Sequence, residues 1–290
     1  MELAFLIMAH KNVNQIARLI DKLDSDTSTF VIHFDAFGDN EEFIELREMY
    51  RHKSNIYFIN RHKCYWGDIS LIKVELECIE LLLNENINFD YALLLSGQDY
   101  PIKSLSYIKN ELQANRGKEF LQYFELPYDG WPNGGYDRLR YFHINKLNLR
   151  NRHTNALTTF LYKVNRRIKI PRSKVDYNFY GGSQWWCLSK DCLQYISKFL
   201  EEDPQYYKFF KYVNIPDEFF FQTIIMNSPF REKVINDNLK YIDWTGPELP
   251  AIFRKKDCDR LLSSSKLFAR KFDQSIDEEI LNLIDRTLVN

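Results

Sequence analysis

The sequence lacks several patterns that would point at once to a common class of enzyme. Its 290 residues contain neither a Walker phosphate loop nor a G-x-G-x-x-G turn, which argues against kinases and dinucleotide-dependent dehydrogenases. The five cysteines are odd in number and form no C-x-x-C pair, so the sequence indicates buried free thiols in a reducing compartment. The formal net charge of -1 argues against a generally basic nucleic-acid-binding protein, and we expect no nucleic-acid partner.

A membrane-spanning or targeting pattern is also missing from residues 1–10. This stretch has no basic n-region, and its apolar run is too short to span a bilayer. We therefore interpret it as the first core strand and expect a cytoplasmic protein.

The first 125 residues alternate short apolar runs with helical patterns, which is typical of an α/β fold with a mostly parallel twisted sheet flanked by helices. Strands are predicted at residues 3–8, 30–34, 56–59, 91–95 and 119–124, and helices at 13–23, 40–50, 69–83 and 104–114. The clearest helix is 69–83, because its apolar residues step by three and four along one face. Because we find no repeat or low-complexity linker, residues 1–290 are predicted to form a single domain.

Polar residues follow the predicted strands at the positions where α/β sheets collect their ligands. His10 follows the first strand, Asp35 the second, and the turn from Ser96 to Pro101 a later one. Gly97 in this turn allows a ligand to approach the backbone, and Asp35 can accept hydrogen bonds from a ribose or a uracil. Taken singly, His10 and Asp35 are also ordinary cap or turn residues.

Two adjacent carboxylates, Asp217 and Glu218, stand between Pro216 and an apolar run. The pattern predicts one buried helix beginning near Pro216, with a carboxylate held against an apolar wall. Desolvation of that kind would raise the pKa of Glu218 toward the range of a general base. The alternative is that both acids only complement the dipole of a core helix.

Aromatic residues make up 16% of the chain, a high share. Their rings serve as core filling and as flat platforms for sugars. Trp185 and Trp186 lie on a predicted strand and must face opposite sides, so we expect one in the core and the other free to stack on a ligand.

A basic segment extends from Arg138 to Lys174, with eleven Lys or Arg residues and no Asp or Glu. Its apolar residues at helical spacing predict a basic amphipathic helix: Leu157, Phe160, Leu161, Val164 and Ile168. We favour a helix that faces the core and has a solvated basic side. The alternative is peripheral contact with an anionic acceptor or an anionic membrane, at the inner face of that membrane.

Seven segments occur together in an order that resembles the core-2/I-branching β-1,6-N-acetylglucosaminyltransferase family, which also contains the peptide O-xylosyltransferases. They are Ala4–Asn12, Val31–Asp35, Trp66-Gly67, Leu93–Pro101, Gly182–Trp186, Pro216–Glu218 and Phe268–Asp273. The resemblance implies a GT-A-type, inverting glycosyltransferase that uses a UDP-sugar without a metal ion. Residues 1–125 would form its nucleotide-sugar-binding half, and residues 126–290 its acceptor-binding and catalytic half. Without the anchor and disulfides of the animal members, the chain is similar to a bacterial-type member.

The same resemblance implies roles for individual residues. Glu218 would be the general base and Lys271 the cation that stabilises the departing diphosphate, assisted by Arg270 or Arg254, because Glu248 stands where the family has an arginine. The uridine and sugar of the donor would contact His10, Asp35, Trp66, Gly97, Gln98 and Asp99. The acceptor would contact Glu125, Trp131, Arg138, Trp185, Trp186 and Trp244.

The chemistry of sugar transfer needs a base for the acceptor hydroxyl and positive charge for the departing UDP. The two Asp-x-Asp sequences, at residues 24–26 and 257–259, are interpreted as surface features, so we expect no metal and no cofactor. The expected reaction moves GlcNAc from UDP-GlcNAc, in β linkage, to a hydroxyl of a glycan or glycolipid. The alternatives are a UDP-xylose-dependent xylosyltransferase, a metal-dependent enzyme on the same fold and a glycan-binding module without catalysis.

Overall fold

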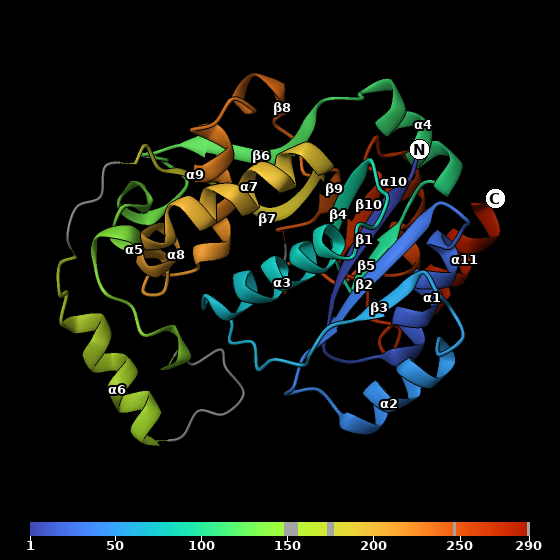
Figure 1. Ribbon diagram of the computed structural model, residues 1–290. Helices are drawn as coiled ribbons and strands as arrows, with labels where there is room; N and C mark the ends of the chain where they lie inside the picture. The colour runs from blue at the N-terminus through green and yellow to red at the C-terminus, as the bar shows by residue number, and fades with distance from the viewer. Residues whose placement is uncertain (148–155, 173–176, 246–247, 289–290) are drawn as a thin grey trace.

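A seven-stranded sheet runs through the molecule (Figure 1). The computed structural model describes residues 1–147, 156–172, 177–245 and 248–288. Four parallel strands form one part of the sheet, in the order β3 (Ile56–Phe58), β2 (Ser28–Phe34), β1 (Leu3–Ala9) and β4 (Tyr91–Ser96). The sheet continues through β7 (Tyr180–Ser189), which is antiparallel to both neighbours, to β6 (Glu119–Glu125) and β8 (Val234–Ile235). The expected α/β fold with a mostly parallel sheet is confirmed.

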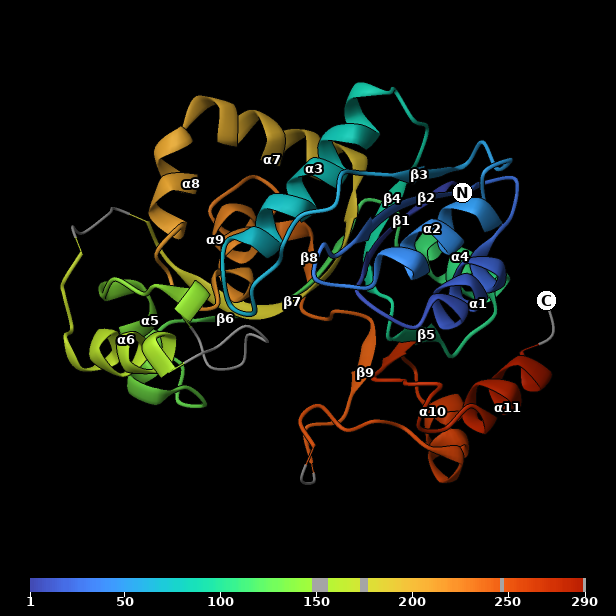
Figure 2. The ribbon, with the colours of Figure 1, turned by 90° about the horizontal axis from the view of Figure 1, so that it is seen from below.

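Alternate side chains of β1 enter two hydrophobic clusters, one on each face of the sheet. Leu3, Phe5 and Ile7 belong to the first cluster, whereas Ala4 and Leu6 belong to the second. The first cluster also contains side chains of α1 (Val13–Leu23), α2 (Asn40–Met49), α4 (Leu105–Ala114), α10 (Cys258–Ser263) and α11 (Glu279–Thr287). The second contains side chains of α3 (Ser70–Asn84), α7 (Lys190–Glu202), α8 (Pro204–Phe210) and α9 (Phe220–Met226). Figure 2 shows α3 and α7 on one side of the central strands and α1 with α11 on the other.

A second sheet of three short strands returns the C-terminal segment to the central strands. Its order is β5 (Asp99–Pro101), β10 (Phe268–Arg270) and β9 (Lys240–Ile242), with β10 antiparallel to β5 and parallel to β9. Because β5 follows the turn after β4, this pairing places Arg270 opposite Asp99. The segment after β10 therefore lies beside the carboxyl end of β4.

The predicted strands and helices of the first 125 residues agree with the observed bounds to within two residues at each end. Local caps account for several of the helix starts. The side chains of Asp39, Ser104 and Ser189 accept hydrogen bonds from backbone N–H groups in the first turns of α2, α4 and α7. The pattern of apolar and polar residues was therefore sufficient to locate these elements, and the caps explain where three of the helices begin.

The described part of residues 126–172 consists of short helices and turns at one end of the molecule (Figure 1). They are η1 (Pro132–Gly135), α5 (Asp137–Arg140), η2 (Asn145–Leu147) and α6 (Ala156–Arg167). The other 3₁₀ helices are η3 (Pro216–Glu218), η4 (Arg231–Lys233) and η5 (Lys255–Asp257). Residues 148–155, 173 and 174 of the predicted basic segment lie outside the described residues. In the described ranges, no helix combines the length and the apolar character needed to cross a membrane.

Candidate active site

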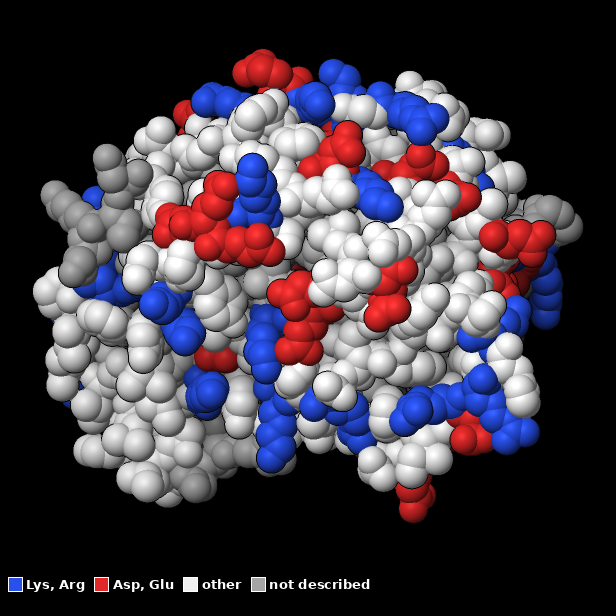
Figure 3. Space-filling model, in the orientation of Figure 1, with Lys and Arg blue, Asp and Glu red and all other residues white. Residues whose placement is uncertain are grey.

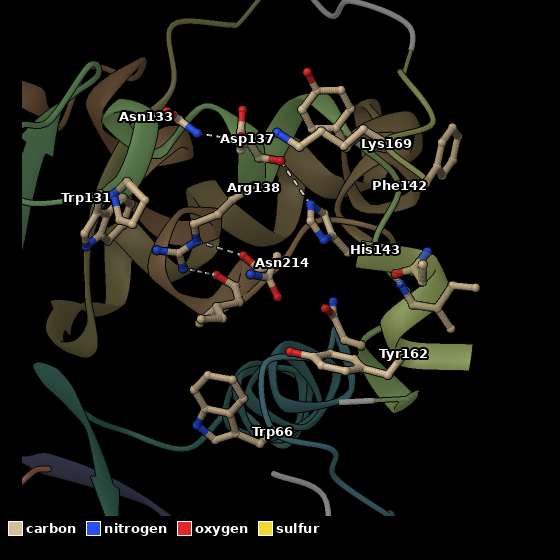
Figure 4. Close-up of a pocket in the computed structure, with 16 residues that line it drawn as sticks. Trp66, Trp131, Asn133, Asp137, Arg138, Phe142, His143, Tyr162, Lys169 and Asn214 are labelled. Carbon is tan, nitrogen blue, oxygen red and sulfur yellow. Dashed lines mark hydrogen bonds and ion pairs between the residues drawn. The ribbon is translucent and has the colours of Figure 1, made fainter. Parts of the chain in front are cut away.

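A pocket of about 540 Å³ opens between the short helices of residues 131–169 and the turns at Trp66 and Ile215 (Figure 4). Its wall combines aromatic rings with polar groups. The rings are those of Trp66, Trp131, Tyr141, Phe142 and Tyr162, and the polar side chains include Asn133, Asp137, Arg138, His143, Asn165, Lys169 and Asn214. Flat rings with a few fixed polar groups form the kind of surface that binds a sugar.

Arg138 holds the carboxylate of Glu218 beside this pocket. Its Nη2 lies 2.7 Å from Glu218 Oε2. Nη2 also donates to the carbonyl of Ile215 at 3.0 Å, and Nε donates to the carbonyl of Asn214 at 3.1 Å (Figure 4). The guanidinium carbon also lies 4.1 Å from the centroid of the Trp131 ring. A guanidinium held by hydrogen bonds and by a ring has one defined position. Glu218 is therefore oriented, yet its side chain keeps 32% of its surface exposed and can meet a bound hydroxyl.

The turn before Glu218 fits closely against the turn that carries Trp66. Ile215 has a φ of 53°, in the left-handed region that β-branched residues rarely adopt. Its N–H donates to the carbonyl of Gly67 at 3.0 Å. Gly67 itself has a φ of 68°, and a Cβ on it would lie 3.1 Å from Ile215 Cγ1. The two turns fix Trp66 in the pocket wall and Glu218, which does not itself line the pocket, against Arg138, which does. Strained backbone of this kind is common at functional sites.

Asp217, rather than Glu218, is the buried acid of this pair. The expected single helix from Pro216 onward is instead the short η3 followed by α9, and this break turns Asp217 inward. No hydrogen-bond partner for Asp217 Oδ1 exists among the described residues. Desolvation, with a smaller contribution from the charge of Glu218, raises the pKa of Asp217 to about 7. The desolvation that we expected at Glu218 therefore occurs at Asp217 instead.

Glu75 of α3 is a second buried acid near this turn, and it was not predicted. Its Oε1 accepts a hydrogen bond from Gln184 Nε2 at 2.9 Å, and its Oε2 accepts one from Trp186 Nε1 at 3.4 Å. Desolvation raises the pKa of Glu75 to about 8, the charge of Asp217 adds to this effect, and that of Lys240 opposes it. Glu75 thus interacts electrostatically with two other buried charged groups, Asp217 and Lys240.

Lys240 is in turn bonded to Asp99, which is paired with cations inside the protein. Asp99 is fully buried, and Arg270 Nη1 lies 3.2 Å from its Oδ1. Both cations lie over the ring of Trp185, at 3.9 Å for Lys240 and 4.2 Å for Arg270. The Asp99 carboxylate has no exposed surface in this structure, so its predicted contact with a donor sugar stays a prediction that the geometry does not support. Arg270, predicted to bind the diphosphate, is likewise held by Asp99.

The expectation that one of the adjacent tryptophans is free to stack on a ligand is wrong. Trp185 and Trp186 are both buried and both belong to the second hydrophobic cluster, at a point where the register of β7 against β6 is irregular. Trp186 packs in the core beside Glu75, and Trp185 is covered by Lys240 and Arg270. Neither of these predicted acceptor contacts is exposed.

Lys271 lies beside the carboxyl end of β4. The next residue, Phe272, donates its N–H to the carbonyl of Gln98 at 2.9 Å, and Gln98 Nε2 donates to the carbonyl of Phe272 at 3.4 Å. Burial lowers the pKa of Lys271, and the positive charges of Arg270 and Lys11 act in the same direction. Arg270 and Lys11 are paired with Asp99 and Asp273, and the charge of Asp273 opposes the shift at Lys271.

His10 and Asp35 lie at the same edge. Strands β1 and β2 run parallel with Ala9 opposite Phe34, and the N–H of Asp35 donates to the carbonyl of Ala9 at 2.8 Å. The turn after β4 joins them, because Gly97 donates its N–H to the carbonyl of Met8 at 2.9 Å. Five residues predicted for the donor thus share one sheet edge: His10, Asp35, Gly97, Gln98 and Lys271.

The remaining predicted site residues divide between the pocket and more distant surfaces. Trp66, predicted for the donor, lines the pocket together with Trp131 and Arg138, which were predicted for the acceptor. Three others do not line it in the part of the chain that the structure describes: Glu125, Trp244 and Arg254. Glu125 is exposed on β6, Trp244 is exposed beyond β9, and Arg254 precedes η5.

The sequence matches the family model described as "Core-2/I-Branching enzyme" over residues 3–263. The chain belongs to this family, which confirms the resemblance seen in the sequence.

Among named relatives, xylosyltransferase 2 of Rattus norvegicus is 28% identical over 307 residues, covering 98% of this chain and 33% of the relative. Xylosyltransferase oxt of Drosophila pseudoobscura pseudoobscura is also 28% identical, over 313 residues, 99% of this chain and 33% of the relative. The chain thus spans about a third of the length of these relatives. Among solved structures, galactosyltransferase LgtC in complex with donor and acceptor sugar analogs aligns over 100% of this chain and 97% of that chain, with a TM-score of 0.43 and 11% identity.

Proposed function

We propose that this chain is an inverting glycosyltransferase that transfers a sugar from a UDP-sugar to a hydroxyl of a glycan or glycolipid, with Glu218 as the general base. The observation that carries the proposal is the oriented, partly exposed carboxylate of Glu218 beside an aromatic pocket. Membership of the core-2/I-branching family supports the reaction class. The pocket would hold the acceptor, with Trp66 and Trp131 as platforms for its rings.

In this reaction the acceptor hydroxyl gives its proton to a carboxylate oxygen of Glu218 while its oxygen forms a bond to C1 of the donor sugar. The bond between C1 and the β-phosphate oxygen breaks, and UDP leaves with the electron pair. Attack from the face opposite UDP inverts the anomeric centre. Arg138 acts as a positioning residue, because it fixes the direction of the Glu218 carboxylate.

The departing diphosphate needs positive charge, and we assign this role to Lys271 in a metal-independent mechanism. Its place beside Gln98 at the sheet edge supports the assignment. Arg270 is engaged by Asp99, and Lys11 lies 2.5 Å from Asp273 Oδ2, so both cations already have an acidic partner. Arg254 therefore stays the candidate for the second contact.

The donor is proposed to be UDP-xylose or UDP-GlcNAc. The names of the relatives favour UDP-xylose, whereas the resemblance to the branching enzymes favours UDP-GlcNAc. Release of UDP and formation of a glycosylated product, measured with both donors in excess chelator, would identify the donor. Loss of transfer in chelator, restored by manganese or magnesium, would contradict the metal-independent step.

Glu218→Gln tests the proposed base, because the amide keeps the shape and cannot accept the proton. General-base catalysis contributes about 10²- to 10⁴-fold, so transfer should fall at least 10²-fold while UDP still binds. The matched control is Glu202→Gln, an exposed acid on α7, which should be as active as the wild type. An active Glu218→Gln variant together with an inactive Asp217→Asn variant would move the role of base to Asp217. Failure of every form to bind UDP would favour a glycan-binding module.

A further inference from the structure

Helix α6 exposes its apolar face to solvent. The exposed fractions of Leu157, Phe160, Leu161 and Ile168 are 64%, 62%, 40% and 55%. The favoured expectation, a helix that packs this face on the core, is therefore wrong. The physical reason is that α6 lies at the outer edge of the molecule, beyond the short helices (Figure 1), where no described element covers it.

The polar face of α6 points the other way, toward the candidate acceptor pocket. Tyr162, Asn165 and Lys169 all line that pocket (Figure 4). Lys169, just beyond the helix, lies 2.9 Å from Asp137 Oδ2 of α5. The Asn165 side chain accepts the N–H of Ile144 at 3.3 Å. These contacts fix the orientation of the helix, with polar side chains inward and apolar side chains outward, the reverse of an ordinary surface helix.

The segment after α6 extends the apolar surface, because Ile170 is 51% exposed. Phe142, whose N–H donates to the carbonyl of Ile170 at 3.0 Å, and Ile144 are also exposed but line the pocket. We call the residues Leu157, Phe160, Leu161, Ile168 and Ile170 the α6 face.

The charged residues of α6 itself are all basic. Lys163 and Arg167 on the helix are exposed, and no ion pair joins either of them to an acid within the described ranges. The sequence from Arg138 to Lys174 holds no Asp or Glu at all. In Figure 3 this corner of the molecule is mostly white, with blue side chains beside it.

We propose that the α6 face docks on an anionic lipid bilayer, with its apolar side chains in the interface and Lys163 and Arg167 at the lipid phosphates. A helix with large apolar residues on one face and flanking cations is the usual element for this purpose. A twelve-residue helix is roughly 18 Å long and about 10 Å wide, which offers far less than the roughly 800 Å² per partner of a stable protein interface. Size and charge therefore favour a membrane over a protein partner or a second copy.

Docking in this orientation sets the acceptor pocket next to the lipid headgroups, because the same helix lines both surfaces. A sugar attached to a lipid would then be the accessible acceptor, a point that rests on the proposed function. The docking itself does not, and Glu218→Gln should bind vesicles as the wild type does.

Cosedimentation with phosphatidylcholine vesicles, with and without 30% phosphatidylserine, tests the proposal at about 50 and 500 mM NaCl. The protein should bind the phosphatidylserine vesicles at low salt and lose most of this binding at high salt, since the Debye length falls from about 14 Å to about 4 Å. Each cation at an anionic leaflet strengthens binding roughly fivefold, so Lys163→Glu with Arg167→Glu should weaken it at least about 25-fold. Leu157→Ser with Phe160→Ser should weaken it by a similar or larger factor, because two large apolar side chains leave the interface.

Matched variants on other exposed surfaces serve as controls. Arg51→Glu with Lys198→Glu makes the same change of charge away from α6, and Ile44→Ser with Met49→Ser makes the same apolar change on α2. Both should bind vesicles like the wild type. All changed side chains are exposed, and a thermal unfolding curve checks that each variant is folded.

Absence of binding to phosphatidylserine vesicles at low salt would overturn the proposal. So would equal binding by the α6 and control variants. Self-association in sedimentation velocity that Phe160→Ser abolishes, without vesicle binding, would replace the membrane by a second copy of the chain.

Discussion

The acids of two ion pairs, Glu218 and Asp99, were both expected from the sequence to contact substrate. The structure places them in different surroundings. Glu218 and Arg138 meet beside the pocket, with a third of the Glu218 side chain exposed. Asp99 is fully buried between two cations. A charged group that is buried and fully paired holds parts of a fold together, whereas a paired group that keeps exposed surface can still react. The exposed surface of the carboxylate therefore separates the two roles, and a sequence motif carries no information about it.

The buried pair should give the largest effect on stability. Asp99→Asn leaves Lys240 and Arg270 without a counter-charge, and breaking a buried pair costs about 3 to 5 kcal/mol. Urea unfolding followed by fluorescence measures the change, with the exposed Asp26→Asn as control. A loss under about 1 kcal/mol would remove the contrast between the two pairs, because Asp99 would then be as replaceable as a surface acid.

The pocket pair should instead affect transfer. Arg138→Met removes the charge-assisted hydrogen bond that orients Glu218, a contact worth about 1.5 to 3 kcal/mol, or roughly 10- to 150-fold in rate. The expected result is a fall in kcat with unchanged UDP affinity. A variant that loses UDP binding but keeps kcat would place Arg138 at the donor and would break the comparison.

The two neighbouring acids can be separated by pH. Burial raises the pKa of Asp217 to about 7, so its folded form holds a proton more tightly than the unfolded chain does. The free energy of unfolding should therefore fall as pH rises from about 4 to about 7, and Glu75 adds a fall of the same sign up to about pH 8. Asp217→Asn removes the contribution of Asp217 to this decrease. The Tm of the variant minus the Tm of the wild type should therefore be larger at pH 8 than at pH 5. An equal difference in Tm at the two pH values would contradict the burial of an ionisable Asp217.

Sequence reasoning was most successful where the period of apolar residues decides the structure. The helix α1 and the strands β1 and β4 have near-continuous or strongly periodic apolar patterns, and their positions were predicted closely. That Lys271 and Gln98 both belong to a donor site was implied only by the family resemblance, and the structure brings the two segments together through hydrogen bonds between Phe272 and Gln98. Nothing local to either residue encodes the pairing of β10 with β5 that produces this arrangement.

The incorrect predictions about side-chain exposure have a common physical cause, because segments distant in sequence bury these side chains. Trp185 is covered by Lys240 and Arg270, and no feature of residues 180–189 shows that. Glu75 could have been found, because it stands with Ile72 and Ile79 on the buried face of α3, where a carboxylate calls for an explanation.

The spacing of apolar residues also could not predict the inverted orientation of α6. A helical pattern shows that one face is apolar but does not say whether the core or the solvent meets it. Here the pocket takes the polar face, and the apolar face is left outside.

In the proposed mechanism, donor binding and proton transfer belong to different residues, Lys271 at the sheet edge and Glu218 beside the pocket. Calorimetric titration of UDP into Lys271→Ala and Glu218→Gln, with transfer measured in the same samples, separates the two roles. Lys271→Ala should weaken UDP binding and lower turnover further, because the charge on the diphosphate grows in the transition state. Glu218→Gln should bind UDP like the wild type and transfer at least 10²-fold more slowly. Near-normal UDP binding and turnover in Lys271→Ala, or loss of UDP binding in Glu218→Gln, would contradict this mechanism.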